Sequence, residues 1–186
     1  MLIHAGDVTV YGELDVIEDF NEWLRELPHQ HKLVIPGNHD ICWEREPKTR
    51  ELITNAKLLV DESVEIDGVK FYGSPFSPWI SDIWVFGYHP LSFPWDRIPK
   101  GTKVLITHGP PVGILDGVPR AGGRFLQHVG CQKLRSAVME IRPKIHIFGH
   151  IHPGFGHESF GSTDFYNVAL LDDMYEMVNE PVVIEI

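Results

Sequence analysis

Four short motifs of metal-binding residue types recur along the chain, each at the end of an apolar run. They are Gly6-Asp7, Gly37-Asn38-His39-Asp40, His108-Gly109 and Gly149-His150-Ile151-His152. Carboxylate, amide and imidazole groups are suitable ligands for manganese, iron, zinc or nickel. The glycines allow the backbone to turn sharply, so that the next side chain can point into a cleft. The motifs therefore predict a transition-metal centre rather than a thiolate-rich structural zinc site, since the chain has two cysteines.

The elements that must position these motifs can be predicted from the apolar pattern. Strands are expected in the apolar runs at residues 1–4, 33–36, 56–60, 104–107 and 145–148. Helical spacing of apolar residues predicts a helix from Val16 to Leu27, ended by Pro28, and another around Leu134, Val138 and Ile141. Because functional loops in α/β sheets collect at one set of strand ends, the four motifs are expected to meet in one cleft.

Further elements complete the predicted α/β organisation. Asp67-Gly68 between two apolar runs predicts a hairpin, so antiparallel pairing is expected within the sheet. We also expect a helix within Arg45–Asn55, a long ordered loop over Ser74–Gly101, and closing strands at Val168–Leu171 and Val182–Ile186.

Composition limits the class of protein. The chain has 186 residues, of which 43% are apolar and 23% charged, as in an ordinary globular protein, and we expect a single domain over residues 1–186. The net charge of -10 argues against binding long nucleic acid through a basic surface. Neither a membrane span nor a secretory signal is evident, so no membrane partner and a cytoplasmic location with reduced cysteines are expected.

The ordered motifs resemble those of the calcineurin-like metallophosphoesterases, over Met1 to about His152. The resemblance is closest to the metallophosphoesterase-domain phosphodiesterases that act on cyclic nucleotides, through the segments 3–7, 107–111 and 142–144. It implies a two-sheet mixed β sandwich flanked by helices and a small phosphoester substrate. It also implies two divalent metals that clamp a phosphoryl group and lower the pKa of a bound water.

The resemblance also implies a role for each motif residue. Asp7 would bridge two metals, with Asn38, His108 and His150 on the second metal and His152 on the first. His39 would be the imidazole that protonates the leaving oxygen, and Asp40 would orient it.

One family motif is absent. The family begins with an Asp-x-His motif on an interior strand before Gly-Asp, whereas nothing in this sequence precedes Met1, so the first metal keeps only Asp7 and His152. We therefore expect one weak metal site and a sheet lacking the family's first strand. A truncated gene, a strand lent by a partner chain in an oligomer, and a protein that works with one tight metal all remain open.

Other residues have weaker claims to function. His4 and His157 could contact ligands or substrate, whereas His146 is expected in the core and His29, His31, His89 and His128 are expected to have no metal role. Trp79, Trp84 and Tyr88 could stack a nucleobase or form a loop core.

Three functions are consistent with these observations. The first is a phosphodiesterase for small phosphodiesters, cyclic nucleotides included, impaired to the extent that the missing motif matters. The second is a catalytically weak module that binds one metal and a phosphate or nucleotide. The third is a purely structural metal site.

Overall fold

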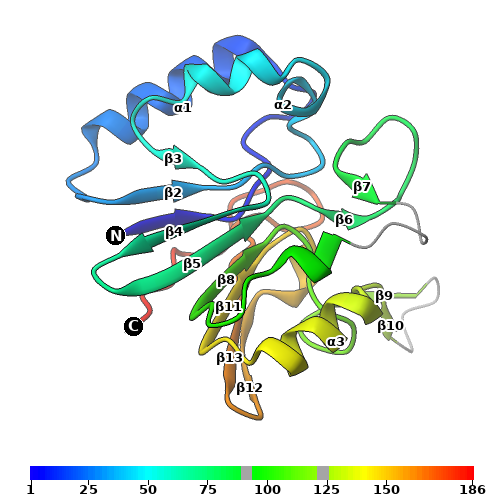
Figure 1. Ribbon diagram of the computed structural model, residues 1–186. Helices are drawn as coiled ribbons and strands as arrows, with labels where there is room; N and C mark the ends of the chain where they lie inside the picture. Colours follow the sequence, from blue (N-terminus) through cyan, green and yellow to red (C-terminus); the bar gives the residue numbers. More distant parts are fainter. Residues whose placement is uncertain (89–93, 121–125) are drawn as a thin grey trace.

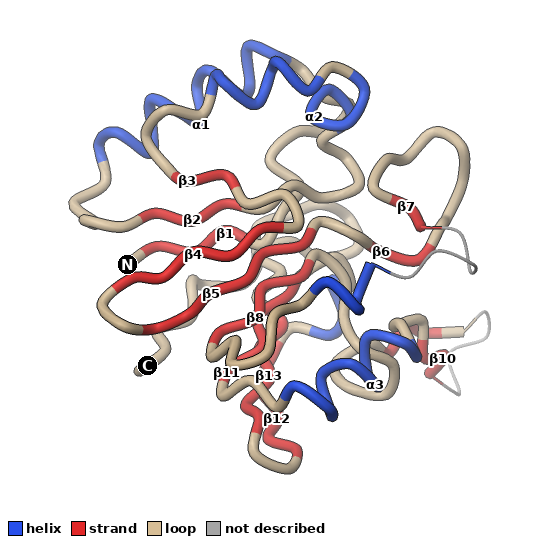
Figure 2. The backbone as a smooth tube through the Cα atoms, viewed as in Figure 1, coloured by secondary structure: helices blue, strands red, loops and turns tan. Residues whose placement is uncertain are grey.

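The computed structural model describes residues 1–88, 94–120 and 126–186. Two sheets form the centre of the molecule and the helices lie on their outer sides (Figure 2). The first sheet is parallel and contains β1 (Leu2–His4), β2 (Lys32–Val34) and β3 (Lys57–Leu58) in that order.

The second sheet is six-stranded and mixed, with the order β12-β13-β11-β8-β5-β4 (Figure 1). Its strands are β4 (Glu62–Ile66), β5 (Val69–Ser74), β8 (Val104–Thr107), β11 (Ile145–Phe148), β12 (Gly156–Phe160) and β13 (Thr163–Asn167). The four inner strands run parallel, and the edge strands β4 and β12 pair antiparallel to their neighbours. The carboxyl ends of β8 and β11 therefore lie side by side, which brings the residues after Thr107 next to those after Phe148.

Within the described residues, three α-helices and several short segments surround the sheets. The helices are α1 (Leu14–Glu26), α2 (Ile41–Arg45) and α3 (Gln132–Ile141), and the 3-10 helices are η1 (Pro47–Leu52), η2 (Pro94–Arg97) and η3 (His152–Gly154). Two small strand pairs join β6 (Ser77–Pro78) to β7 (Gly87–Tyr88) and β9 (Gly117–Pro119) to β10 (Leu126–His128). In the described part of the chain, no helix combines the length and apolar character needed to cross a bilayer.

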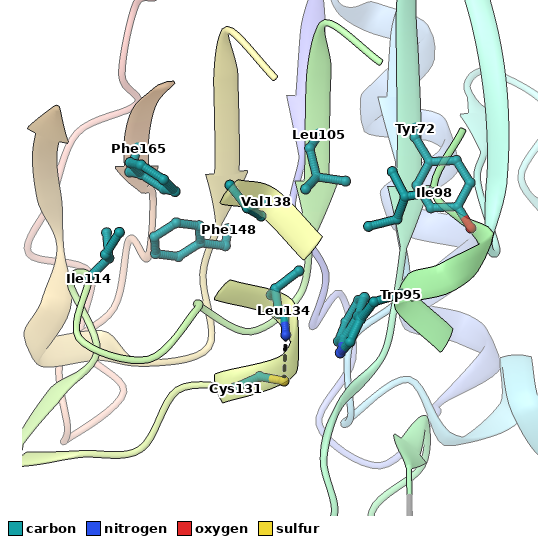
Figure 3. Close-up of a cluster of buried hydrophobic side chains, with 10 residues drawn as sticks. All are labelled: Tyr72, Trp95, Ile98, Leu105, Ile114, Cys131, Leu134, Val138, Phe148 and Phe165. Atoms are coloured by element: carbon teal, nitrogen blue, oxygen red, sulfur yellow. Dashed lines mark hydrogen bonds between the residues drawn. The ribbon is translucent and has the colours of Figure 1, made fainter. Parts of the chain in front are cut away.

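Buried apolar side chains pack α1, the two sheets and α3 against one another. Ile17 and Leu24 of α1 pack against Val34 of β2, and a second cluster that includes Leu33 and Ile106 fills the space between the sheets. The third cluster packs α3 against the large sheet (Figure 3) and consists of Tyr72, Trp95, Ile98, Leu105, Ile114, Cys131, Leu134, Val138, Phe148 and Phe165. Because each fully buried large side chain contributes about 1.5–3 kcal/mol, this packing holds the strand ends in place.

The predicted α/β class with a mixed two-sheet core and flanking helices is confirmed. The strands that precede the four motifs and the two amphipathic helices are present. The hairpin is present too, and both Asp67 (φ +50°) and Gly68 (φ +77°) adopt the left-handed backbone that its tight turn requires.

Three predicted elements are wrong. The helix expected within Arg45–Asn55 is instead the end of α2 followed by the 3-10 helix η1, because Pro47 cannot continue an α-helix. Val182–Ile186 forms no strand, and Val168–Leu171 contributes a single bridge from Leu171 to Met177. The sheet is completed instead by the hairpin of β12 and β13.

The predicted loop over Ser74–Gly101 contains β6, β7 and η2, and its residues 89–93 lie outside the described part.

Candidate metal centre

The four sequence motifs meet at the carboxyl ends of β1, β2, β8 and β11. Asp7 follows β1, Asn38 follows β2, His108 follows β8, and His150 follows β11. One carboxylate oxygen of Asp7 and one ring nitrogen each of His108 and His150 lie within 4.8 Å of one another. The rings of His108 and His150 are 4.7 Å apart between centroids. These three side chains can therefore share one metal ion.

His108 is the buried centre of this group. Its Nδ1 lies 3.0 Å from the carbonyl oxygen of Ala5, to which it can donate. Its Nε2 lies 2.9 Å from Asn38 Oδ1 and 3.2 Å from Asp7 Oδ2. When Nδ1 carries the proton of a neutral ring, Nε2 offers a lone pair beside two oxygen acceptors. A cation among these three atoms would satisfy all of them, so the donor set fits a divalent transition metal.

Two glycines make room for this convergence. A Cβ on Gly37 would overlap the Asp7 carboxylate, lying 2.5 Å from Asp7 N and 2.6 Å from His108 Cε1. A Cβ on Gly6 would lie 2.6 Å from His108 Nδ1, and Gly6 has a left-handed φ of +99°. Asp7 (φ +60°) and His150 (φ +68°) are also left-handed, so backbone strain is concentrated at the ligands.

The protonation states follow from burial and charge. Burial works against ionisation of Asp7, but His108 and the N–H of His39, which donates to Asp7 Oδ1 at 2.9 Å, hold the pKa of Asp7 below its usual range. Burial likewise lowers the pKa of His108, but the Asp7 carboxylate outweighs it and the net shift is upward. Burial lowers the pKa of His150 to about 3, which keeps its ring neutral and able to coordinate.

Asp40 links the loop after β1 to the loop after β2 through hydrogen bonds. Its Oδ2 accepts the N–H of Gly37 (2.7 Å) and of Asp7 (3.0 Å), and its Oδ1 accepts the N–H (2.9 Å) and the hydroxyl (3.0 Å) of Thr9. Burial and the Asp7 charge raise the pKa of Asp40 to about 7, while these donors favour its ionised form. The carboxylate therefore positions Asp7 through backbone contacts.

A cavity of about 270 Å³ opens beside the ligands. Its lining includes the ligand-type residues Asp7, Asn38, His150 and His152, together with His39, Ile80, Trp84, Val118, Ile151, Pro153, Asp173 and Tyr175. The cavity is therefore lined by polar, apolar and aromatic side chains.

The model of the calcineurin-like phosphoesterase family matches residues 1–154. The chain belongs to this family. Metallophosphoesterase domain-containing protein 1 of Homo sapiens is 37% identical over an alignment covering 100% of this chain and 64% of the human protein. UPF0046 protein K07C11.7 of Caenorhabditis elegans is 35% identical, covering 98% and 67% respectively. This chain thus spans less than two thirds of the human relative's length.

A solved structure shares the fold at a TM-score of 0.62 and 20% identity, covering 84% of this chain and 63% of that one. The calcineurin-like resemblance inferred from the motifs is confirmed, and so is the fold that it implies.

The contacts of His39 and Asp40 differ in part from those that the resemblance implies. His39 lines the cavity, but its Nδ1 lies 2.9 Å from the carbonyl oxygen of Val10. The resemblance implies that Asp40 orients His39; in this structure the Asp40 oxygens accept hydrogen bonds from Gly37, Asp7 and Thr9.

His152 lies at the cavity but outside the group of three ligand side chains. Its Nδ1 lies 2.7 Å from the carbonyl oxygen of Asp172, which leaves Nε2 available for a ligand role.

The other histidines separate into core and surface positions. His146 is fully buried as expected, with Nε2 2.8 Å from Thr107 Oγ1. His4 packs on Phe20 of α1, and His157 stacks on Tyr166 of β13 near Asp164; neither lines the cavity. His128 pairs with Asp116. His89 lies outside the described residues.

Several cavity residues carried no signal in the sequence. Asp173 and Tyr175 line the cavity but belong to no recognisable motif, and they lie far from the four motifs in the sequence except for His152. Thr9 contacts Asp40 and lies outside the cavity lining. Of the aromatic residues considered, Trp84 lines the cavity, while Trp79 is 56% exposed and lies outside its lining.

Proposed function

We propose that this chain is a metal-dependent phosphodiesterase that hydrolyses small phosphodiesters, with cyclic nucleotides as leading candidates. The observation that carries the proposal is the convergence of Asp7, Asn38, His108 and His150. Three of these residues line a cavity that His39 also lines, and His108 lies buried behind them. Family membership supports phosphoester chemistry. The cavity of about 270 Å³ suits a small substrate rather than a polymer.

Each residue has a proposed role. Asp7, Asn38, His108 and His150 would hold one divalent ion, and Asp7 with His152 would hold a second, weaker one. Bound ions would polarise the phosphoryl group and offset the charge that develops during in-line displacement. Because the His39 Nδ1 faces the Val10 carbonyl oxygen, the Nε2 of His39 is the atom proposed to deliver a proton to the departing oxygen.

Hydrolysis of bis(p-nitrophenyl) phosphate in the presence of Mn²⁺ tests the proposal. We expect His108→Ala to lose metal-stimulated hydrolysis, because it removes the buried ligand. His157→Ala is the matched control, since His157 is about half exposed on β12 and lies outside the cavity lining. Full activity of His108→Ala would contradict the proposal.

One observation favours a second candidate, a weakly catalytic module that binds a single metal with phosphate or a nucleotide. Among the described residues, the group of converging ligand side chains includes Asp7, His108 and His150 but not His152. Metal counting separates the candidates. Two ions per chain with turnover support the dinuclear enzyme, whereas one ion with phosphate binding and no turnover supports the module.

A further inference from the structure

Tyr175 is largely exposed, but its ring lies near two histidines of the site. Its side chain is 61% exposed, yet its ring lies edge-on to two histidines of the site, 5.5 Å from His152 and 6.5 Å from His39 between centroids. It lines the same cavity as the metal-ligand candidates. The ring therefore borders the place where a substrate would sit.

The backbone holds Tyr175 in a strained conformation. Its φ of +61° is left-handed, which L-residues other than glycine adopt at a cost. The loop is fastened by Asp172, whose Oδ1 accepts the N–H groups of Met174 (2.8 Å) and Glu176 (3.0 Å) and whose carbonyl accepts the Tyr175 N–H (3.0 Å). Since the ring is largely exposed, burial does not offset this strain. A strained residue beside a site is a motivated candidate for function.

Trp84 provides a second aromatic surface in the same cavity. Its ring lies 4.0 Å from the His39 ring and stacks on Tyr11, at 6.0 Å with 8° between the planes. Ile80 and Val118 add apolar lining. Aromatic and apolar groups therefore line the cavity together with His39, the proposed proton donor. The ester group that leaves the phosphate would lie beside His39 and contact these groups.

We propose that Tyr175, together with Trp84, binds the planar aromatic part of the substrate's ester group, which is either an aryl ring or a nucleobase. Tyr175 is then a specificity-determining residue. The inference rests on the proposed function, which places the phosphoryl group at the ligands and the ester group beside His39. Aromatic rings accept planar groups with little dependence on their identity, so the surface selects for planarity rather than for one base.

Calorimetric binding of phosphomonoesters to the Mn²⁺-loaded protein tests this inference, because in a monoester a planar group stays joined to the phosphate. The probes are phenyl phosphate, 5′-AMP and inorganic phosphate. Tyr175→Gly removes the ring and suits the left-handed backbone, so it is expected to fold at least as well as the wild type. We expect it to bind phenyl phosphate or 5′-AMP about tenfold more weakly, with affinity for inorganic phosphate unchanged. Loss with one probe only identifies which planar group is recognised.

Two further variants sharpen the test. Tyr175→Phe keeps the ring and should bind like the wild type. Met174→Ala, in the same loop but outside the cavity lining, is the matched control and should also bind like the wild type. The inference is overturned if Tyr175→Gly weakens inorganic phosphate equally, if it leaves both aromatic probes unaffected, or if the wild type binds phenyl phosphate and 5′-AMP no better than phosphate. Wild-type binding of this pattern without diester hydrolysis would instead refute the proposed function alone.

Discussion

Replacing Asp40 with asparagine should destabilise the protein, because this carboxylate joins the loop after β1 to the loop after β2. Its two oxygens accept four hydrogen bonds, from Gly37 N, Asp7 N, Thr9 N and Thr9 Oγ1. Asparagine offers one oxygen and an NH₂ group, so about two of the four donors would face another donor. At about 1–3 kcal/mol for each buried donor left unsatisfied, the lost contacts would cost about 4 kcal/mol. The neutral amide also relieves the unfavourable burial of a charge beside Asp7, which raises the pKa of Asp40, so we expect a net loss of about 2 kcal/mol in the free energy of unfolding.

Urea unfolding followed by tryptophan fluorescence measures this loss. The assay is run with EDTA at pH 8, above the pKa of about 7 of Asp40, so that the carboxylate is ionised in the wild type. With a slope of about 2 kcal/mol per molar urea, the midpoint should fall by about 1 M. Asp19→Asn, an exposed change on α1, should shift stability by less than about 0.5 kcal/mol. A midpoint for Asp40→Asn within about 0.5 M of the wild type would contradict a stabilising role for these four contacts.

Three further changes have expected outcomes. Gly37→Ala should lower Mn²⁺ affinity by at least about tenfold in a calorimetric titration, because its Cβ overlaps the Asp7 carboxylate, and unchanged affinity would contradict the ligand assignment. His39→Ala should lower kcat far more for a diester with an alkoxide leaving group than for one releasing p-nitrophenolate, which needs no proton; equal losses would exclude a general acid. Burial lowers the pKa of His146 to about 3, below its unfolded value of 6.5, so the unfolded state takes up the proton first and stability falls as pH drops from 6.5 toward 3. His146 alone should contribute a loss of about 2 kcal/mol by pH 5, measured by urea unfolding, and His146→Gln should remove this part of the pH dependence.

The sequence predicted the elements whose signal is local. Strand runs that end in glycine, the Asp67-Gly68 turn and the apolar face of α1 each involve neighbouring residues, and the structure contains all three. Because the strand ends lie together, the ligand-type residues that follow them also meet. At Pro47 the prediction failed, because the proline ends α2 and the residues after it form a 3-10 helix instead of the predicted α-helix.

Features that depend on distant contacts were not predictable. The Asp40 carboxylate bonds Thr9 across 31 positions, and no spacing rule distinguishes that contact from one with the adjacent His39. Tyr175 reaches the cavity only because the loop at Asp172 turns back over His152. The hairpin of β12 and β13 was missed because all but one residue of β12 are exposed, which leaves little apolar signal.

Metal analysis of the purified protein after Mn²⁺ loading and gel filtration tests whether Asp7, His108 and His150 bind a divalent metal. We expect at least one ion to be retained per wild-type chain, with that ion lost in His108→Ala and kept in His157→Ala. A wild-type chain that retains no ion, or a His108→Ala variant that retains as many as the wild type, would contradict this metal assignment.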